Sequence, residues 1–208
     1  MTRVGMWLAQ EAKRQVEAAV VQAEAKTSAE FVVTVRVSSG SYRAADLWFA
    51  SLVTFVGLLI YVYHPTEFTD DLVPPALFLL FLLSGAFASQ LSLLRRLLTP
   101  TSVLEENTRR AAHVEFHAQG IGATQGRTGI LVYVSLLERS VAVVPDVGVD
   151  LAALGGDGET ALATLRTAAR AGGLEALVAG LAQLSDALSR TLPRADDDVN
   201  ELPDSVVS

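Results

Sequence analysis

The pattern of hydrophobic and polar positions divides the chain into two kinds of segment. Residues 4–26 repeat hydrophobic positions at helical spacing, and residues 31–37 (FVVTVRV) form a β-branched run typical of a buried strand. The pattern then changes, because no Asp, Glu, Lys or Arg occurs in residues 47–66 or 72–94. Two long uncharged stretches therefore follow a strand of the ordinary soluble type.

The uncharged stretches predict a transmembrane helical hairpin, with helices at about 47–65 and 73–94. Each is long enough to cross a hydrocarbon core of roughly 30 Å. The first carries ten Leu, Ile, Val or Phe residues, which favour insertion by about 3 to 6 kcal/mol. The alternative is a helical hairpin buried in a globular core, but a core helix normally keeps a polar face.

The flanking charges predict the orientation of this hairpin. Arginines precede the first stretch and follow the second, whereas the connecting loop 64–71 has three acidic residues and no Lys or Arg. Because positive charge stays on the cytoplasmic side, we expect a multi-pass protein of the inner membrane with both termini in the cytoplasm.

The residues after the hairpin return to soluble patterns. They predict a helix at 102–120 ending on Gly120, two strands at 130–135 and 141–144 that form a hairpin, and two further helices from residue 158 onward. The predicted fold is therefore an α/β domain that is split after its first strand by the membrane hairpin. Its parts are residues 1–45, the hairpin 46–95, residues 96–193, and an acidic tail at 194–208.

Composition narrows the classes of function. The chain has 208 residues, half of them hydrophobic, and no cysteine, which excludes disulfides and thiolate chemistry. A net charge of −7 without a basic stripe argues against nucleic-acid binding. The lipid bilayer and a protein are the expected partners. A homo-oligomer stays open, because Gly85, Ala86 and Ala88 would suit close helix packing.

Three stretches carry a resemblance to a known family. AEAKTSAEFVVTVRVSSGSYR (23–43), ATQGRTGILVYVSLLERSVAVVPDVGVD (123–150) and DDDVNELPD (196–204) resemble the TPM domain family, which includes thylakoid-lumen phosphatase-like proteins and photosystem repair factors. They look most like its bacterial membrane branch, in which hydrophobic helices interrupt the domain after its first strand. The resemblance implies a small three-layer α/β/α sandwich around a mixed sheet.

The resemblance also bears on activity. Some soluble members of the family are described as acid phosphatases and others as calcium-binding proteins, with Asp-Asn-Gly opening the middle strand and an acidic residue in the next. The corresponding positions here are Arg127-Thr128-Gly129 and Val143. Two hard oxygen ligands are therefore missing, and calcium needs six to eight. No cofactor is predicted, and a divalent cation stays open.

The candidate site residues each have a structural alternative. Asp146, at a strand end, suits a nucleophile or ligand at the sheet edge, or a turn aspartate. Arg127 and Thr128 suit anion binding, or Arg127 pairs with a neighbouring acid or with lipid phosphates close to the bilayer. His113 and His117, four apart on one helix, suit a metal held together with Asp146 or Asp150, or are two polar histidines of an amphipathic helix.

Three functions follow as hypotheses. The first is a membrane-anchored interaction or assembly module at the cytoplasmic face of the inner membrane. The second is a membrane-bound phosphatase-like hydrolase, which requires a polar cleft collecting Asp146, Arg127 and a histidine. The third is a metal or ligand sensor coupled to the membrane helices, which requires three converging ligands. No motif supports an assignment as an enzyme.

Overall fold

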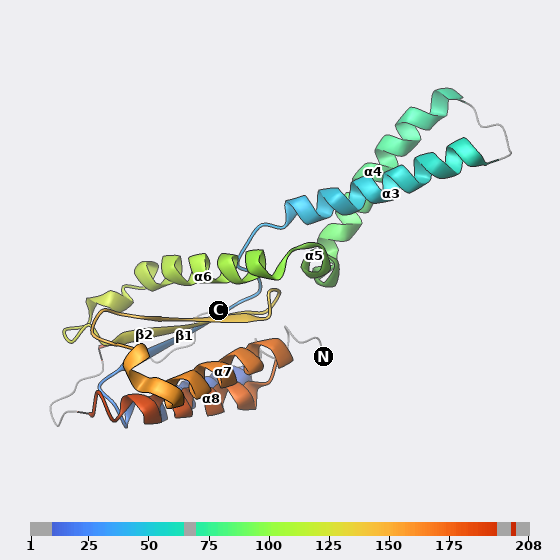
Figure 1. The fold of residues 1–208 in the computed structure, drawn as a ribbon. Coiled ribbons are helices and arrows are strands. Elements are labelled where there is room, and N and C mark those ends of the chain that lie inside the picture. The colour runs from blue at the N-terminus through green and yellow to red at the C-terminus, as the bar shows by residue number, and fades with distance from the viewer. Residues whose placement is uncertain (1–9, 65–69, 195–200, 203–208) are drawn as a thin grey trace. The chain divides into compact units, whose positions relative to one another are not determined.

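The computed structural model describes residues 10–64, 70–194 and 201–202 (Figure 1). The chain folds into two compact units. The first is drawn from the residues up to Ser39 and from Glu105 onward, and the second is the inserted segment Gly40–Leu104. The first unit contains the sheet, and the second contains the two long apolar helices.

The first unit is built on a mixed sheet of three strands in the order β1-β2-β3. β1 (Glu30–Arg36) pairs in parallel with β2 (Gly129–Ser135), and β2 pairs antiparallel with β3 (Ser140–Pro145). The predicted strand positions and the β2-β3 hairpin are confirmed. β3 is therefore an edge strand of the sheet.

Helices cover both faces of this sheet. Alternate residues of β2 point to opposite sides, so Ile130 and Val132 join one core cluster and Leu131 and Tyr133 join the other. α6 (Thr101–Ala118) covers one face, and α2 (Gln10–Glu24), α7 (Gly155–Ala171) and α8 (Leu174–Leu188) cover the other. The predicted α/β fold with a mixed sheet is confirmed, and its layers are α, β and α.

The larger core cluster draws heavily on α8. Leu177, Leu181, Leu184 and Leu188 recur at three- and four-residue spacing and are fully buried. Each contributes about 1.5–3 kcal/mol through burial of its side chain. The expected end of α6 is also confirmed, because Gly120 takes a left-handed conformation with φ of 67°. Residues 4–9 of the predicted first helix lie outside the described residues.

The inserted unit contains two helices that are long and apolar enough to cross a membrane, α3 (Arg43–Tyr63) and α4 (Val73–Gln90). Only 17% and 11% of their most apolar windows are buried, so they are not core helices of this unit. A 3-10 turn, Asp70–Leu72, precedes α4. The prediction that the second helix continues to residue 94 is wrong, because Leu91 is extended and a short helix, α5 (Ser92–Leu98), follows.

The break at Leu91 places Arg95 of α5 beside Asp46 in the first turn of α3. Arg95 Nε and Nη2 donate to the two carboxylate oxygens of Asp46 at 2.9 and 2.7 Å. The Asp46 side chain is 12% exposed and that of Arg95 26%. This bidentate ion pair joins the two ends of the inserted unit.

Two residues of the DDDVNELPD motif in the predicted acidic tail lie against the α/β unit. The Glu201 carboxylate accepts hydrogen bonds from the Gln125 N–H at 3.1 and 3.3 Å, and the Glu201 N–H donates to Glu30 Oε1 at 2.8 Å. Leu202 packs on the core cluster under α6. The other residues of the DDDVNELPD motif lie outside the described residues.

Candidate functional site

The loop that leads from α6 into β2 holds Arg127 in an uncommon backbone conformation. Its φ is 53°, in the left-handed region that residues other than glycine rarely adopt. Thr124 shapes this loop: its carbonyl accepts the Arg127 N–H at 3.1 Å, and its hydroxyl accepts the Thr128 N–H at 3.1 Å. The Arg127 carbonyl in turn accepts the Gly148 N–H at 2.9 Å. The loop is thereby tied to the segment that follows β3.

Asp146 follows β3 directly and is buried, with 5% of the residue exposed. Its N–H donates to the Gly129 carbonyl at 2.8 Å, which fixes it beside the start of β2. Its Oδ1 accepts hydrogen bonds from the Val147 N–H at 2.8 Å and from Arg127 Nη2 at 2.9 Å. Arg127 Nε lies 2.7 Å from Oδ2. The guanidinium therefore lies against both oxygens of the carboxylate, but only Oδ1 accepts a hydrogen bond from it.

The charge of Asp146 is stabilised against its burial. Burial raises the pKa of the Asp146 carboxyl, but three effects together lower it more: the hydrogen bond from Arg127, that from the Val147 N–H, and the positive charges of Arg127 and His117. The resulting pKa lies below the ordinary aspartate value. Asp146 is thus held ionised at neutral pH.

Replacing Arg127 by glutamine should raise the pKa of Asp146, because burial remains while the main lowering partner is gone. A depressed folded-state pKa contributes stability that is present above the unfolded-state pKa and is lost as pH falls through the folded one. In Arg127→Gln the folded-state pKa moves toward the unfolded one or above it, so this contribution to stability at neutral pH should shrink or disappear. An NMR titration of the Asp146 carboxyl carbon measures the shift. Arg14→Gln, an exposed arginine of α2, is the control, and an unchanged titration in Arg127→Gln would contradict the assignment.

A cavity of about 460 Å³ lies next to this ion pair. One wall comes from α6 and the turn that follows it, and the other from the end of β3. It is lined by His113, Phe116, His117, Gly120, Gly122, Ala123, Arg127, Val144, Pro145, Asp146 and Val147. The cavity therefore offers an ionised carboxylate, a guanidinium and two exposed imidazoles to a ligand.

The structure brings together four of the six predicted site residues: Asp146, Arg127, His113 and His117. Thr128 does not line this cavity; its carbonyl accepts the Glu30 N–H at 3.2 Å and joins the loop to β1. Asp150 lies elsewhere too, because its carboxylate accepts the Ala152 N–H at 2.9 Å, at the start of a 3-10 turn. Arg127 pairs with an acid, as its structural interpretation expects, and it also lines the cavity, where it could bind an anion.

The structure does not bring the predicted metal ligands together as a set. Within the described parts of the chain, no three His, Cys, Asp or Glu residues converge so that they could hold a metal ion. Arg127 occupies the Asp146 carboxylate, so a cation there would have to displace the guanidinium. The metal candidates His113, His117, Asp146 and Asp150 stay predictions.

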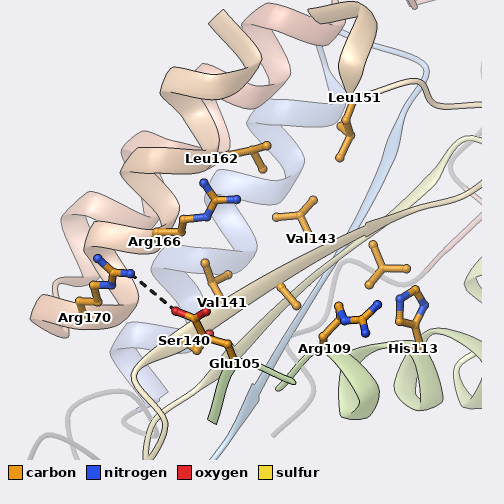
Figure 2. A pocket seen from close by; sticks show the side chains of 12 residues that line it. Glu105, Arg109, His113, Ser140, Val141, Val143, Leu151, Leu162, Arg166 and Arg170 are labelled. Carbon is orange, nitrogen blue, oxygen red and sulfur yellow. Dashed lines mark ion pairs between the residues drawn. The ribbon is translucent and has the colours of Figure 1, made fainter. Parts of the chain in front are cut away.

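The sequence reasoning missed a groove along β3. Its volume is about 540 Å³, and Figure 2 shows its lining side chains on the two helices that flank the strand. α6 contributes Glu105, Arg109 and His113, while α7 contributes Leu162, Arg166 and Arg170. The signal in the sequence was the pair Arg166 and Arg170, which are four apart and so share a face of the helix.

A buried polar cluster at the opposite end of β2 was also missed. Ser39 Oγ lies 2.6 Å from Ser135 Oγ and 3.1 Å from the Tyr133 hydroxyl, and the Ser39 N–H donates to the Glu138 carboxylate at 2.7 Å. Burial raises the pKa of the Tyr133 hydroxyl. These groups satisfy one another's hydrogen-bonding capacity. The cluster is therefore best explained as holding the chain in place where it leaves β1.

Comparison with known proteins identifies the fold. No family model matches the chain, and no curated protein is significantly similar to it. Among solved structures, the fold is similar to the NMR structure of the BA42 protein from the psychrophilic bacterium Bizionia argentinensis. The TM-score is 0.57 at 17% sequence identity, over 97% of this chain and 94% of that one. At this identity the likeness establishes a shared fold.

Proposed function

We propose that the chain is a membrane-anchored protein whose α/β domain binds another protein, as an interaction or assembly module at the cytoplasmic face of the inner membrane. The observation that carries the anchor is the exposure of large apolar side chains on both helices of the inserted unit. Phe55 is 56% exposed, Phe78 64% and Leu83 60%. Exposed apolar surface of this extent is typical of contact with lipid or with another protein.

The binding half of the proposal is supported by the groove along β3, an open cavity on an edge strand with charged walls. We also place the chain in the TPM domain family. The three matching stretches support this, as does the similarity of fold to BA42, which agrees with the sandwich that the resemblance implies. The cytoplasmic orientation is proposed from the arginines that flank the hairpin.

The anchor predicts that the protein stays in the membrane pellet after an alkaline carbonate wash. The double variant Phe55→Arg with Leu82→Arg should be released. Each arginine at mid-helix opposes insertion by about 2.5 to 3.5 kcal/mol, which is comparable with the free energy that favours insertion of the helix that carries it. Val114→Arg, which replaces an exposed apolar residue of α6, is the matched control and should stay in the pellet.

Release of the wild-type protein by carbonate would contradict the anchor. The binding half is tested separately, by capturing the tagged full-length protein from a mild-detergent extract of membranes. A partner should be retained in stoichiometric amount, and capture without one would contradict an assembly role. The two readouts are independent, so each half of the proposal can fail alone.

A phosphatase-like hydrolase is the second candidate, because one cavity collects Asp146, Arg127, His113 and His117. An arginine and two imidazoles suit a phosphate group, and a carboxylate of low pKa suits a nucleophile. The ion pair with Arg127 would have to open before Asp146 could attack. Hydrolysis of p-nitrophenyl phosphate by the purified full-length protein, compared with Asp146→Asn, decides between a reactive and a structural carboxylate.

A further inference from the structure

We infer that the free edge of β3 is a docking site for an extended acidic segment of a partner protein, which adds to the sheet as a fourth strand. The inference deepens the proposed function and rests on its claim that the α/β unit binds another protein. It specifies the surface used, the conformation of the bound segment and the charge of its side chains.

The backbone of β3 offers hydrogen-bonding groups at this edge. In an antiparallel pair, residues that exchange hydrogen bonds alternate with residues that do not. The Asp146 N–H donates to the Gly129 carbonyl, so with the observed register the bonded partners on β3 are Val144 and Ala142. Val141 and Val143 therefore direct their N–H and C=O groups away from β2. No strand of the described residues pairs with that side of β3.

The groove has room for a strand in the middle layer. α6 and α7 lie on opposite faces of the sheet, and both contribute side chains to the cavity beside β3 (Figure 2). A strand next to β3 would lie between these two helices, at the 4.7–4.9 Å spacing of sheets. Its alternate side chains would face α6 on one side and α7 on the other. Strand addition at such an edge is a common mode of peptide recognition.

The walls of the groove select the side chains of the bound segment. On the α6 side they present His113 and Arg109, which is paired with Glu106 at 2.6 Å, and on the α7 side Leu162 followed by Arg166 and Arg170. Glu105 is the one acidic side chain of the lining, and it lies 3.8 Å from Arg170. Within the described parts of the chain, Arg166 forms no ion pair. Acidic side chains facing Arg166 and Arg170 of α7, and apolar ones on the other face of the added strand, complement this surface.

Two other occupants of the groove, a second copy of the chain and the chain's own acidic end, fit it less well. A second copy of the chain paired through β3 would bring another positively charged Arg166 to the same groove, which is unfavourable. The chain's own acidic end is anchored at Glu201 by Gln125 and Glu30, and Leu202 is packed on the core cluster under α6. We therefore assign the groove to a separate protein and test the other two directly.

The probe is a synthetic seven-residue peptide, acetyl-Glu-Val-Glu-Val-Glu-Val-Glu-amide, labelled with a fluorophore and titrated with the full-length protein in detergent micelles. It should bind with an affinity that falls as salt is added. It should also slow hydrogen exchange at the amides of Val141 and Val143, because these would become hydrogen-bonded. The peptide with lysine in place of glutamate is the matched control and should not bind.

Two variants separate backbone pairing from charge. Val143→Pro removes an N–H that points away from β2, so the ladder of the sheet is kept while strand addition is blocked; binding should be lost. Arg166→Glu reverses a charge on the wall and should weaken binding about tenfold, which corresponds to about 1.4 kcal/mol. Arg14→Glu, the same change on α2, should leave the affinity within about twofold.

Several results would overturn the inference. They are the absence of peptide binding, equal binding of the lysine peptide, or full binding by both Val143→Pro and Arg166→Glu. Binding that appears only after removal of residues 203–208 would assign the groove to the chain's own end, and a β3-dependent dimer would assign it to a second copy. Peptide binding is measured on purified protein, so it can succeed or fail independently of membrane extraction and partner capture.

Discussion

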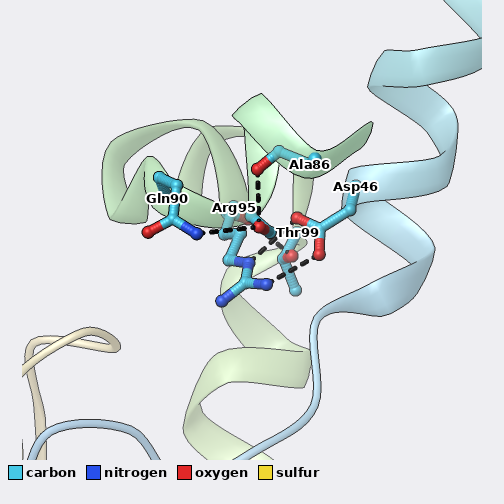
Figure 3. Close-up of polar contacts among 6 residues, drawn as sticks. Asp46, Ala86, Gln90, Arg95 and Thr99 are labelled. Carbon is cyan, nitrogen blue, oxygen red and sulfur yellow. Dashed lines mark hydrogen bonds and ion pairs between the residues drawn. The ribbon is translucent and has the colours of Figure 1, made fainter. Parts of the chain in front are cut away.

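Replacing Asp46 by alanine is expected to destabilise the inserted unit by about 2 to 4 kcal/mol. Figure 3 shows the reason: Arg95 is directed at the Asp46 carboxylate, while Thr99 lies in the same cluster and its hydroxyl donates to the Arg95 carbonyl at 2.6 Å. Removing the acid leaves a guanidinium that is only 26% exposed without its bidentate partner. The free energy of unfolding in mixed detergent micelles measures the effect.

Asp71→Ala is the matched control, because Asp71 belongs to the same unit and is exposed; we expect a change within about 0.5 kcal/mol. The double variant Asp46→Leu with Arg95→Leu should recover much of the loss, since apolar residues of similar volume often replace a buried ion pair without cost. Equal stability of Asp46→Ala and wild type would show that the pair is screened by solvent and contributes little.

Replacing Gly148 by alanine is expected to destabilise the α/β unit by about 1 to 3 kcal/mol and to disrupt the Asp146 cavity. A Cβ at this position would lie 2.6 Å from the carbonyl oxygens of both Gly126 and Arg127. These are backbone atoms, so the clash cannot be relieved by rotating a side chain. The loop that carries Arg127 would have to move, which also separates the guanidinium from Asp146. Chemical denaturation and the Asp146 titration report the two effects.

Gly156→Ala is the matched control for this substitution. Gly156 lies in the first turn of α7, and a Cβ there meets no atom within 4 Å. We expect stability to be unchanged or to rise by a few tenths of a kcal/mol, because alanine restricts the unfolded chain. If Gly148→Ala matched this control in both measurements, the close approach of the two loops would not be required for the site.

The order of elements in the fold could be predicted from the sequence because each element follows a local rule. The β-branched run of β1 and the regular leucines of α8 each point to one structure, and Gly120 ends α6 as expected. The end of α4 could not be predicted. Leu91 is neither glycine nor proline, and the break there accompanies the ion pair between Arg95 and Asp46, which are 49 positions apart. Such a contact leaves no local pattern.

The candidate site could be predicted only in part, because local patterns identify its residues but not the contacts between them. Asp146 and Arg127 stand out as charged residues at strand ends, and the structure joins them. Their mutual pairing, and the left-handed backbone of Arg127, depend on Gly148 and Thr124 and so on tertiary contacts. Predicting the groove along β3 requires the strand order and the positions of α6 and α7 beside β3. No local sequence pattern indicates either of these.

The Asp46–Arg95 pair also bears on the order in which the chain folds. β1 pairs with β2 from Glu30 to Gly129, a separation of 99 residues (129 − 30). The ion pair joins two residues 49 positions apart within this loop. It therefore shortens the loop that β1 and β2 must close to about half, which lowers the entropy cost of closure by only about 0.6 kcal/mol. At equilibrium, an insertion of this length costs the sheet little. During synthesis, however, β1 has no partner strand until β2 has been made. The inserted helices therefore leave the ribosome before the sheet can form.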